Sequence, residues 1–260
     1  MNLQPLWRHR TCEMNAVGGG ESAVLWIFNT KTTFFEVLPK IIIDERIRAV
    51  CPDMRIGMIR ASVRNCYTDA LLWGEIEAEC AAIVSQYELL EVNKRPAVAQ
   101  TRALYKALGK DPNRYRVASE ALCRRVIRGL GLYRINALVD IINLVSLKSG
   151  YAISGLDADK IVGDTLAMGV GEAGEHYEGI GRGVLNIEGL PVYRDAVGGV
   201  ATPTSDEERT KISIDTVTLQ MNINAFGVEM PLEETMEWSI DLLQRYTEAT
   251  NVECDVIDKF

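Results

Sequence analysis

An almost wholly apolar helix near the middle of the chain constrains the fold most. Residues 135–149 place apolar side chains around nearly the whole helical circumference, and Gly150 follows where a left-handed cap costs least. Such a helix is expected to be buried. Three polar residues interrupt it on one stripe, Asn136, Asp140 and Asn143. Because a buried polar group without a partner costs roughly 1–3 kcal/mol, the stripe is either an internal hydrogen-bond network or the wall of a polar site.

The order of the predicted elements indicates the fold class. A strand is predicted at 54–63, and helices at 69–90, 96–108, 119–128 and 135–149. Strands follow at 165–170, 183–187, 192–197 and 211–223, and a last helix at 231–247. Helices first and strands later favour an α+β fold over a parallel βα repeat. The apolar phase of the strand 211–223 changes near Asp215, which predicts a bulge or bend there.

Length and composition indicate one large domain. The chain has 260 residues, of which 47% are hydrophobic. We expect an N-terminal extension at 1–30, a main domain at 31–230, and a C-terminal helix packed on it within 231–260. No apolar run reaches the roughly 18 residues that span a bilayer, and the six cysteines form no Cys-x-x-Cys pair. These features predict a cytoplasmic protein with reduced thiols, no membrane contact and no metal site.

Positive charge is concentrated in one block of an acidic chain. The net charge is −8, yet residues 94–134 contain 11 Lys or Arg and 2 Asp or Glu. Localised contact with RNA phosphates requires such a block. The alternative is a pair of solvated helices with a basic face.

Two familiar catalytic patterns fail on inspection. Gly169, Gly171 and Gly174 fit a dinucleotide-binding spacing, but the residues that follow do not form the helix on which that motif depends. The chain has two histidines, His9 and His176, and no Gly-x-Ser-x-Gly turn, which argues against a Ser-His-Asp triad. No cofactor is expected.

One segment carries a resemblance to a known family. The run YRINALVDIINLVSLKSGYAISGLDADKI, residues 133–161, resembles the editing domain of the phenylalanyl-tRNA synthetase beta subunit. The likeness extends over about 35–222 and is strongest over 121–216, and the tail of the quoted pattern is Asp157, Asp159 and Lys160. It implies an α+β fold with a layered, β-sandwich-like core, helices packed around it and a site in a cleft of that core. Nothing resembles the synthetase catalytic module, so the chain is similar to a free-standing editing domain.

The resemblance also implies site residues. Asn143 matches an asparagine beside the bound aminoacyl end, and a glycine that shapes the pocket matches the pair Gly198–Gly199. Ser154 stands where the family has a histidine, and Asp215 where it has the glutamate that receives the phenol of wrongly attached tyrosine. These two departures put both catalysis and the preference for tyrosine in doubt.

Further residues are candidates for substrate or tRNA contact. Thr204, Ser205 and Arg209 either line the pocket entrance or belong to a turn-and-cap sequence. Contacts with phosphates are expected from the helical arginines of the basic block, Arg124, Arg125 and Arg128. Asn136 and Asp140 are expected to contribute to the same site.

Three functions remain open from the sequence. The first is hydrolysis of a mischarged aminoacyl-tRNA ester in trans. The second is a tRNA-binding module that does not hydrolyse, which the departures at Ser154 and Asp215 favour. The third is binding of a free amino acid or small metabolite without RNA. Which amino acid or tRNA is involved is not readable from the sequence.

Overall fold

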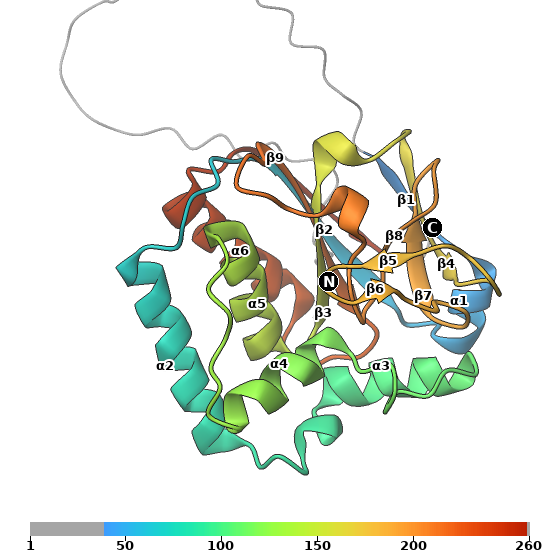
Figure 1. The fold of residues 1–260 in the computed structure, drawn as a ribbon, viewed down its shortest axis with the longest axis horizontal. Coiled ribbons are helices and arrows are strands. Elements are labelled where there is room, and N and C mark those ends of the chain that lie inside the picture. The colour runs from blue at the N-terminus through green and yellow to red at the C-terminus, as the bar shows by residue number, and fades with distance from the viewer. Residues whose placement is uncertain (1–38, 259–260) are drawn as a thin grey trace, which may run out of the picture.

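Three layers make up the part of the chain that the structure describes. The structure is a computed structural model that describes residues 39–258, so the extension expected at 1–30 lies outside it. One layer of helices covers a first sheet, and a second sheet packs on the other face of the first (Figure 1). This arrangement is α+β, as the order of elements predicts, and its core is sandwich-like, as the family resemblance implies.

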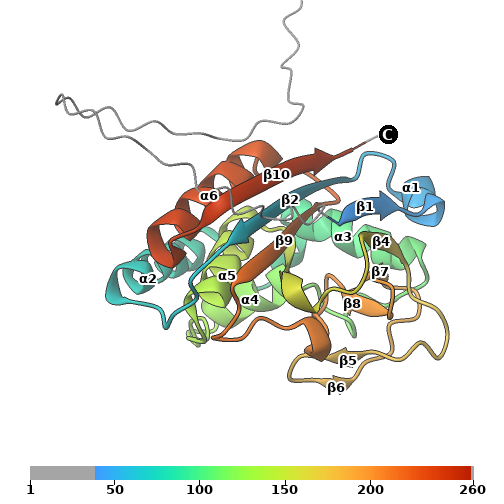
Figure 2. The same cartoon turned by 90° about the horizontal axis from the view of Figure 1, so that it is seen from above.

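The two main sheets each have four strands. The first has the order β10-β2-β9-β3 and the second β1-β4-β7-β8. The first is antiparallel, and it is formed by β10 (Thr250–Ile257), β2 (Arg55–Ser62), β9 (Thr218–Ala225) and β3 (Ala152–Asp157). The second contains β1 (Lys40–Ile43), β4 (Thr165–Val170), β7 (Pro191–Arg194) and β8 (Gly199–Ala201). A small hairpin, β5 (Glu178–Gly179) and β6 (Gly183–Val184), projects beside them (Figure 2).

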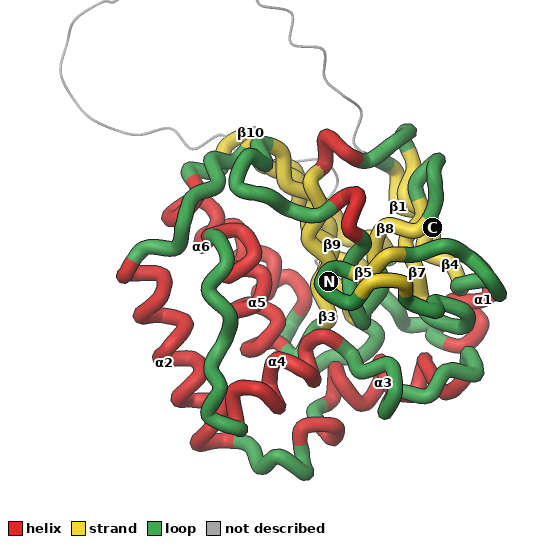
Figure 3. Tube along the Cα trace, viewed as in Figure 1, coloured by secondary structure: helices red, strands yellow, loops and turns green. Residues whose placement is uncertain are grey.

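The predicted central helix is α5 (Ala137–Ser149), buried between the first sheet and its neighbouring helices. Asn136 caps its start by accepting from the Val139 amide at 3.1 Å, and Gly150 ends it with φ of 75°. The other helices are α1 (Glu45–Val50), α2 (Ala70–Gln86), α3 (Pro96–Ala107), α4 (Ala118–Ile127) and α6 (Leu232–Thr247). Figure 3 shows helices α2, α4, α5 and α6 on one side and the second sheet on the other.

A second core lies between the two sheets. Alternation along β2 sends Ile59 and Ala61 toward the helices, and Ile56 and Met58 toward the second sheet. Along β9 the odd-numbered residues are apolar and join the helix-side core. The even-numbered ones are paired with Met58 and its neighbours, and therefore face the inter-sheet layer.

Several strand boundaries differ from the predictions. The strand predicted at 211–223 begins at Thr218, and residues 214–215 form a turn, so the phase change near Asp215 marks a turn and not a bulge. The strand predicted at 183–187 is reduced to Gly183–Val184. Beyond α6, the strand β10 pairs with β2, so the segment 231–260 contributes a strand to the central sheet besides its helix.

Candidate functional site

A row of buried amides faces the layer between the two sheets. Gln220, Asn222 and Asn224 occupy alternate positions of β9, and each is at most 1% exposed. On the neighbouring edge strand β3, Ser154 is paired with Asn222 and is 1% exposed. Burying four polar side chains in an otherwise apolar layer is costly unless each has partners, so the row calls for an explanation.

Two atoms in this row have no partner in the described part of the chain. Gln220 donates to Asn222 Oδ1 at 2.8 Å, which leaves Gln220 Oε1 and Asn222 Nδ2 buried without a hydrogen bond. If the oxygen and nitrogen of both side-chain amides are exchanged, the hydrogen bond between them reverses, and one acceptor and one donor still remain free for a ligand. By contrast, Asn224 is satisfied, since it accepts from the Tyr193 hydroxyl at 2.6 Å and donates to the Ala152 carbonyl at 2.9 Å.

The segment 202–211 closes the cluster at the edge of both sheets. It makes single bridges to β8 through Ala201 and Asp206, and to β3 through Leu156 and Lys211. Both β8 and β3 are edge strands. This segment therefore connects the open edges of the two sheets, with Asp206 in its middle.

Asp206 is an acid beside the amide row. Its carboxylate accepts from the Gly155 amide at 3.0 Å. Burial raises the pKa of Asp206 to about 7, and hydrogen bonds from Gly155 and the Ser154 hydroxyl offset part of that rise. The residue as a whole is only half-buried; the enclosed carboxylate governs its pKa. A carboxyl that titrates near neutral pH can take up or release a proton under physiological conditions.

Three buried tyrosines surround the cluster. Burial raises the pKa of Tyr193 well above its ordinary value, and the nearby charge of Asp206 raises it further. Tyr177 donates to the Ser205 carbonyl at 2.7 Å, and the hydroxyls of Tyr105 and Thr204 are 3.0 Å apart. These hydrogen bonds fix the segment 202–211 to the body of the protein.

The stripe on α5 is an internal hydrogen-bond network for two of its three members. Asn136 is the helix cap, and Asp140 is 1% exposed and accepts from Thr68 and from the Ile135 amide. Asn143 is half-buried. Because α5 packs on the opposite face of β3 from Ser154, these residues do not meet the amide row.

The other residues carried over from the family are not brought together. Asp215 is exposed in the turn before β9. At Gly199 a Cβ would lie 2.8 Å from the Tyr177 ring, so an aromatic side chain fills the space beside it. Gly198 lies in the turn between β7 and β8 and donates to Asp195 at 3.1 Å. Of the four predicted catalytic residues, only Ser154 belongs to the inter-sheet cluster.

Thr204 and Ser205, two of the predicted entrance residues, lie in a turn, but the helical turn that follows begins at Glu208 with Glu207 as its cap. Thr202 accepts from the amides of Thr204 and Ser205, at 3.2 and 3.1 Å. Arg209 makes two hydrogen bonds of 2.9 Å to the buried carboxylate of Asp195, which anchors the segment 202–211 to the turn after β7.

Much of the basic block is neutralised inside the protein. Glu120 of α4 is 1% exposed and pairs with Arg102 at 2.9 Å, Arg124 at 2.8 Å and Arg116 at 3.7 Å. Arg124 is therefore committed to an internal ion pair. Arg125 is half-buried and Arg128 is exposed.

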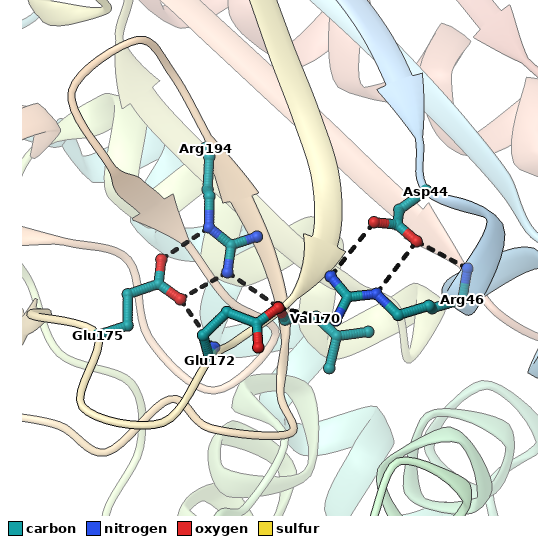
Figure 4. Close-up of polar contacts among 6 residues, drawn as sticks. All are labelled: Asp44, Arg46, Val170, Glu172, Glu175 and Arg194. Atoms are coloured by element: carbon teal, nitrogen blue, oxygen red, sulfur yellow. Dashed lines mark hydrogen bonds and ion pairs between the residues drawn. The ribbon is translucent and has the colours of Figure 1, made fainter.

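The glycine-rich segment after β4 is a connection between strands. At Gly171 a Cβ would lie 1.9 Å from the Ile187 carbonyl oxygen, so only glycine fits beside that backbone. Arg194 binds Glu175 and the Val170 carbonyl there (Figure 4). Figure 4 also draws the contacts that Arg46 makes with Asp44 and with Glu172. No helix follows β4, as the sequence predicts.

Two hollows open elsewhere. One of about 230 Å³ is lined by Arg60, Asp159 and Asp164 among others, and one of about 280 Å³ by Glu79, Lys148 and Trp238 among others. Neither of these two includes a residue of the amide row, whose side chains are at most 1% exposed.

Residues 39–258 include no helix long and apolar enough to cross a membrane. Over the same residues, no group of three His, Cys, Asp or Glu side chains could hold a metal ion. His176 is exposed in the connection between β4 and β5.

The model of the B3/4 domain family matches residues 100–230, half of the chain. This chain belongs to the B3/4 domain family. The match confirms the relationship to the phenylalanyl-tRNA synthetase beta-subunit family, although not the assignment to its editing domain. The amide row, Asp206 and Ser154 all lie within the matched residues.

Among solved structures, a similar chain is an N-terminal fragment of the phenylalanyl-tRNA synthetase beta subunit from Pyrococcus horikoshii. It has 14% sequence identity and a TM-score of 0.39, and the match covers 85% of this chain. The match covers 52% of that fragment, so this B3/4 protein spans about half its length. A comparison with curated proteins found no match.

Proposed function

We propose that this B3/4 protein hydrolyses an aminoacyl ester, of the kind that joins a wrong amino acid to tRNA, at the inter-sheet cluster. The observation that carries the proposal is Asp206, a carboxyl with a pKa of about 7 that contacts the Ser154 hydroxyl, next to an amide pair in which one oxygen and one nitrogen have no hydrogen-bond partner. Membership of the B3/4 family supports an aminoacyl group on tRNA as the substrate class.

The proposed chemistry needs a base, a donor and an acceptor. Asp206 takes a proton from water as the water attacks the ester carbonyl, and returns it to the departing ribose oxygen. The free donor of the Gln220–Asn222 pair stabilises the negative charge that develops on the carbonyl oxygen. The free acceptor binds the α-amino group and so orients the ester.

Entry of a substrate requires the segment 202–211 to move, because that segment closes the cluster. Arg209 and Asp195 are its anchor to the turn after β7. In this proposal the aminoacyl end displaces the segment, and its return excludes water other than the attacking molecule.

A panel of mischarged tRNAs tests this function directly. The wild-type protein is expected to deacylate at least one of them well above the spontaneous rate. Asp206→Asn should lower that rate at least 100-fold, because it removes the base, and Ser154→Ala should lower it about tenfold. Asp164→Asn, at an exposed carboxylate away from the cluster, is the matched control.

The outcomes separate the candidate functions. No deacylation of any tRNA by the wild-type protein would remove the hydrolase proposal. If tRNA binds tightly without turnover, the non-catalytic binding module is the correct alternative. An unaltered rate in folded Asp206→Asn, together with a loss in Asp215→Asn, would return the site to the sequence-based assignment.

A further inference from the structure

Several cations of the basic block lack an ion pair among the described residues, and three of them lie on α4 or between α4 and α5. Arg125, Arg128 and Arg134 make no ion pair with any residue between 39 and 258, in contrast to the arginines bound to Glu120. Arg125 and Arg134 hold neutral partners instead, the Tyr133 hydroxyl at 3.0 Å and the Thr68 carbonyl at 2.7 Å.

Aromatic rings stand among these arginines. The Arg125 guanidinium lies 3.7 Å from the centre of the Tyr133 ring, and that tyrosine is 56% exposed. The Arg134 guanidinium lies 5.0 Å from the centre of the Trp73 ring on α2. Tyr67, which precedes the Thr68 that Arg134 binds, is 78% exposed. The connection from α4 to α5, which contains Arg128 and Arg134, runs beside α2 (Figure 3).

We propose that this surface, Tyr67, Arg125, Arg128, Tyr133 and Arg134, binds a single-stranded RNA segment. Unpaired bases stack on tyrosine rings and guanidinium planes, and free arginines contact phosphates. The charge favours RNA over a protein partner, because Arg125 and Arg128 have no carboxylate partner among residues 39–258 and match a polyanion on a chain whose net charge is −8. The inference rests on the proposed function, since it supplies the RNA contact that an aminoacyl-tRNA substrate needs.

The position of α4 connects this surface to the inter-sheet cluster. The helix starts at the closing segment, where the Ala118 amide donates to the Pro203 carbonyl at 2.8 Å. Its ten residues span about 15 Å. At about 3.4 Å per stacked nucleotide, that length corresponds to roughly four nucleotides. An RNA end whose last residue reaches Asp206 would therefore place its upstream bases at Tyr133.

The surface can be tested without any hydrolysis by measuring the binding of two RNAs that carry no amino acid, a single-stranded oligonucleotide and a tRNA. Tyr133→Ala should weaken binding about tenfold through the loss of stacking, whereas Tyr133→Phe keeps the ring and should bind like the wild type. Arg128→Glu should weaken binding several-fold and reduce the salt dependence by about one phosphate contact. Lys106→Glu, an exposed cation on α3, is the matched control, and thermal unfolding shows that each variant is folded.

The failure of this surface is distinguishable from the failure of the hydrolase. Wild-type affinity in folded Tyr133→Ala and Arg128→Glu, with deacylation intact, overturns the surface and leaves the function. Weakened binding in both variants without any deacylation supports the surface and removes the function. If the wild-type protein binds neither RNA, or if the surface instead mediates self-association in solution, the RNA-binding proposal is wrong.

Discussion

The Asp206 carboxylate accepts a hydrogen bond of 3.0 Å from the Gly155 amide, which lies on the edge strand of the first sheet. Asp206 itself belongs to the segment that continues from β8 at the edge of the second sheet. One carboxyl therefore links the two sheets at the point where the buried amides lie, and its protonation bears on both stability and the proposed chemistry.

Stability should depend on pH through this carboxyl. Its pKa is raised from 3.8 to about 7 by burial, so the folded state favours the protonated form. The stability that the protonated carboxyl contributes to the folded state is complete below about pH 4 and is lost as the pH rises to 7. The variant Asp206→Asn does not ionise at this position. The difference between its free energy of unfolding and that of the wild type should therefore shift in its favour by roughly 2–3 kcal/mol between pH 5 and pH 8. Denaturant unfolding of both proteins at pH 5 and pH 8 measures this shift. The same stability difference at the two pH values would contradict the prediction.

Deacylation should follow the same titration in the opposite direction. The base form of Asp206 predominates above its pKa of about 7, so the rate on a mischarged tRNA should fall tenfold per pH unit below that value. The spontaneous rate at each pH is the reference. A rate that is flat between pH 5.5 and 7 would exclude Asp206 as the base.

The Gln220–Asn222 pair should cost stability in the unliganded protein. The double change Gln220→Met and Asn222→Leu removes both unpartnered atoms at similar volume, and should raise stability by about 1 kcal/mol while abolishing deacylation. Asn224→Leu is the contrasting variant, because it breaks two hydrogen bonds and should cost about 2–3 kcal/mol. Equal destabilisation in both proteins would mean that the pair is structural.

Gly199 and Gly198 should respond differently to a methyl group. A Cβ at Gly199 would be 2.8 Å from the Tyr177 ring, whereas Gly198 has no neighbouring atom within 4 Å. Gly199→Ala should therefore lower the free energy of unfolding by about 1–3 kcal/mol, and Gly198→Ala should change it little. Thermal unfolding of the two variants side by side decides between steric crowding and an open pocket at Gly199.

Glu120 should be important for stability in spite of its charge. It is 1% exposed and bound by three arginines, so Glu120→Gln leaves those cations without their partner and should cost roughly 3 kcal/mol. Glu91→Gln, in the exposed pair with Lys94, should cost less than about 0.5 kcal/mol. Similar midpoints in denaturant for the two variants would contradict this reading.

The elements could be predicted where the local pattern is strong. The helices α3, α4, α5 and α6 lie within one or two residues of their predicted bounds, because Pro96, Pro231 and Gly150 mark ends by backbone geometry alone. The short strands β1 and β8 escape prediction because three or four residues give no periodic signal. The longer strands β3 and β10 are also missing from the predicted elements.

The candidate site was less accessible to sequence reasoning. Nothing in the local sequence marks Asp206 as a buried acid, because its burial results from contacts with Gly155 and Ser154, about 50 residues earlier. The sequence of β9 does contain a usable signal. One face of the strand carries only uncharged amide side chains, those of Gln220, Asn222 and Asn224. A solvent-exposed strand face usually carries charged residues, so uncharged amides in alternation indicate burial between two sheets.

The pairing of β2 has a consequence for how the polypeptide acquires its shape during synthesis. Ser62 pairs with Thr218 of β9 on one side and with Thr250 of β10 on the other. At 5–20 residues per second, β2 leaves the ribosome roughly 8–30 s before either neighbour exists. Throughout that interval an apolar strand has two open edges, at which another chain could pair.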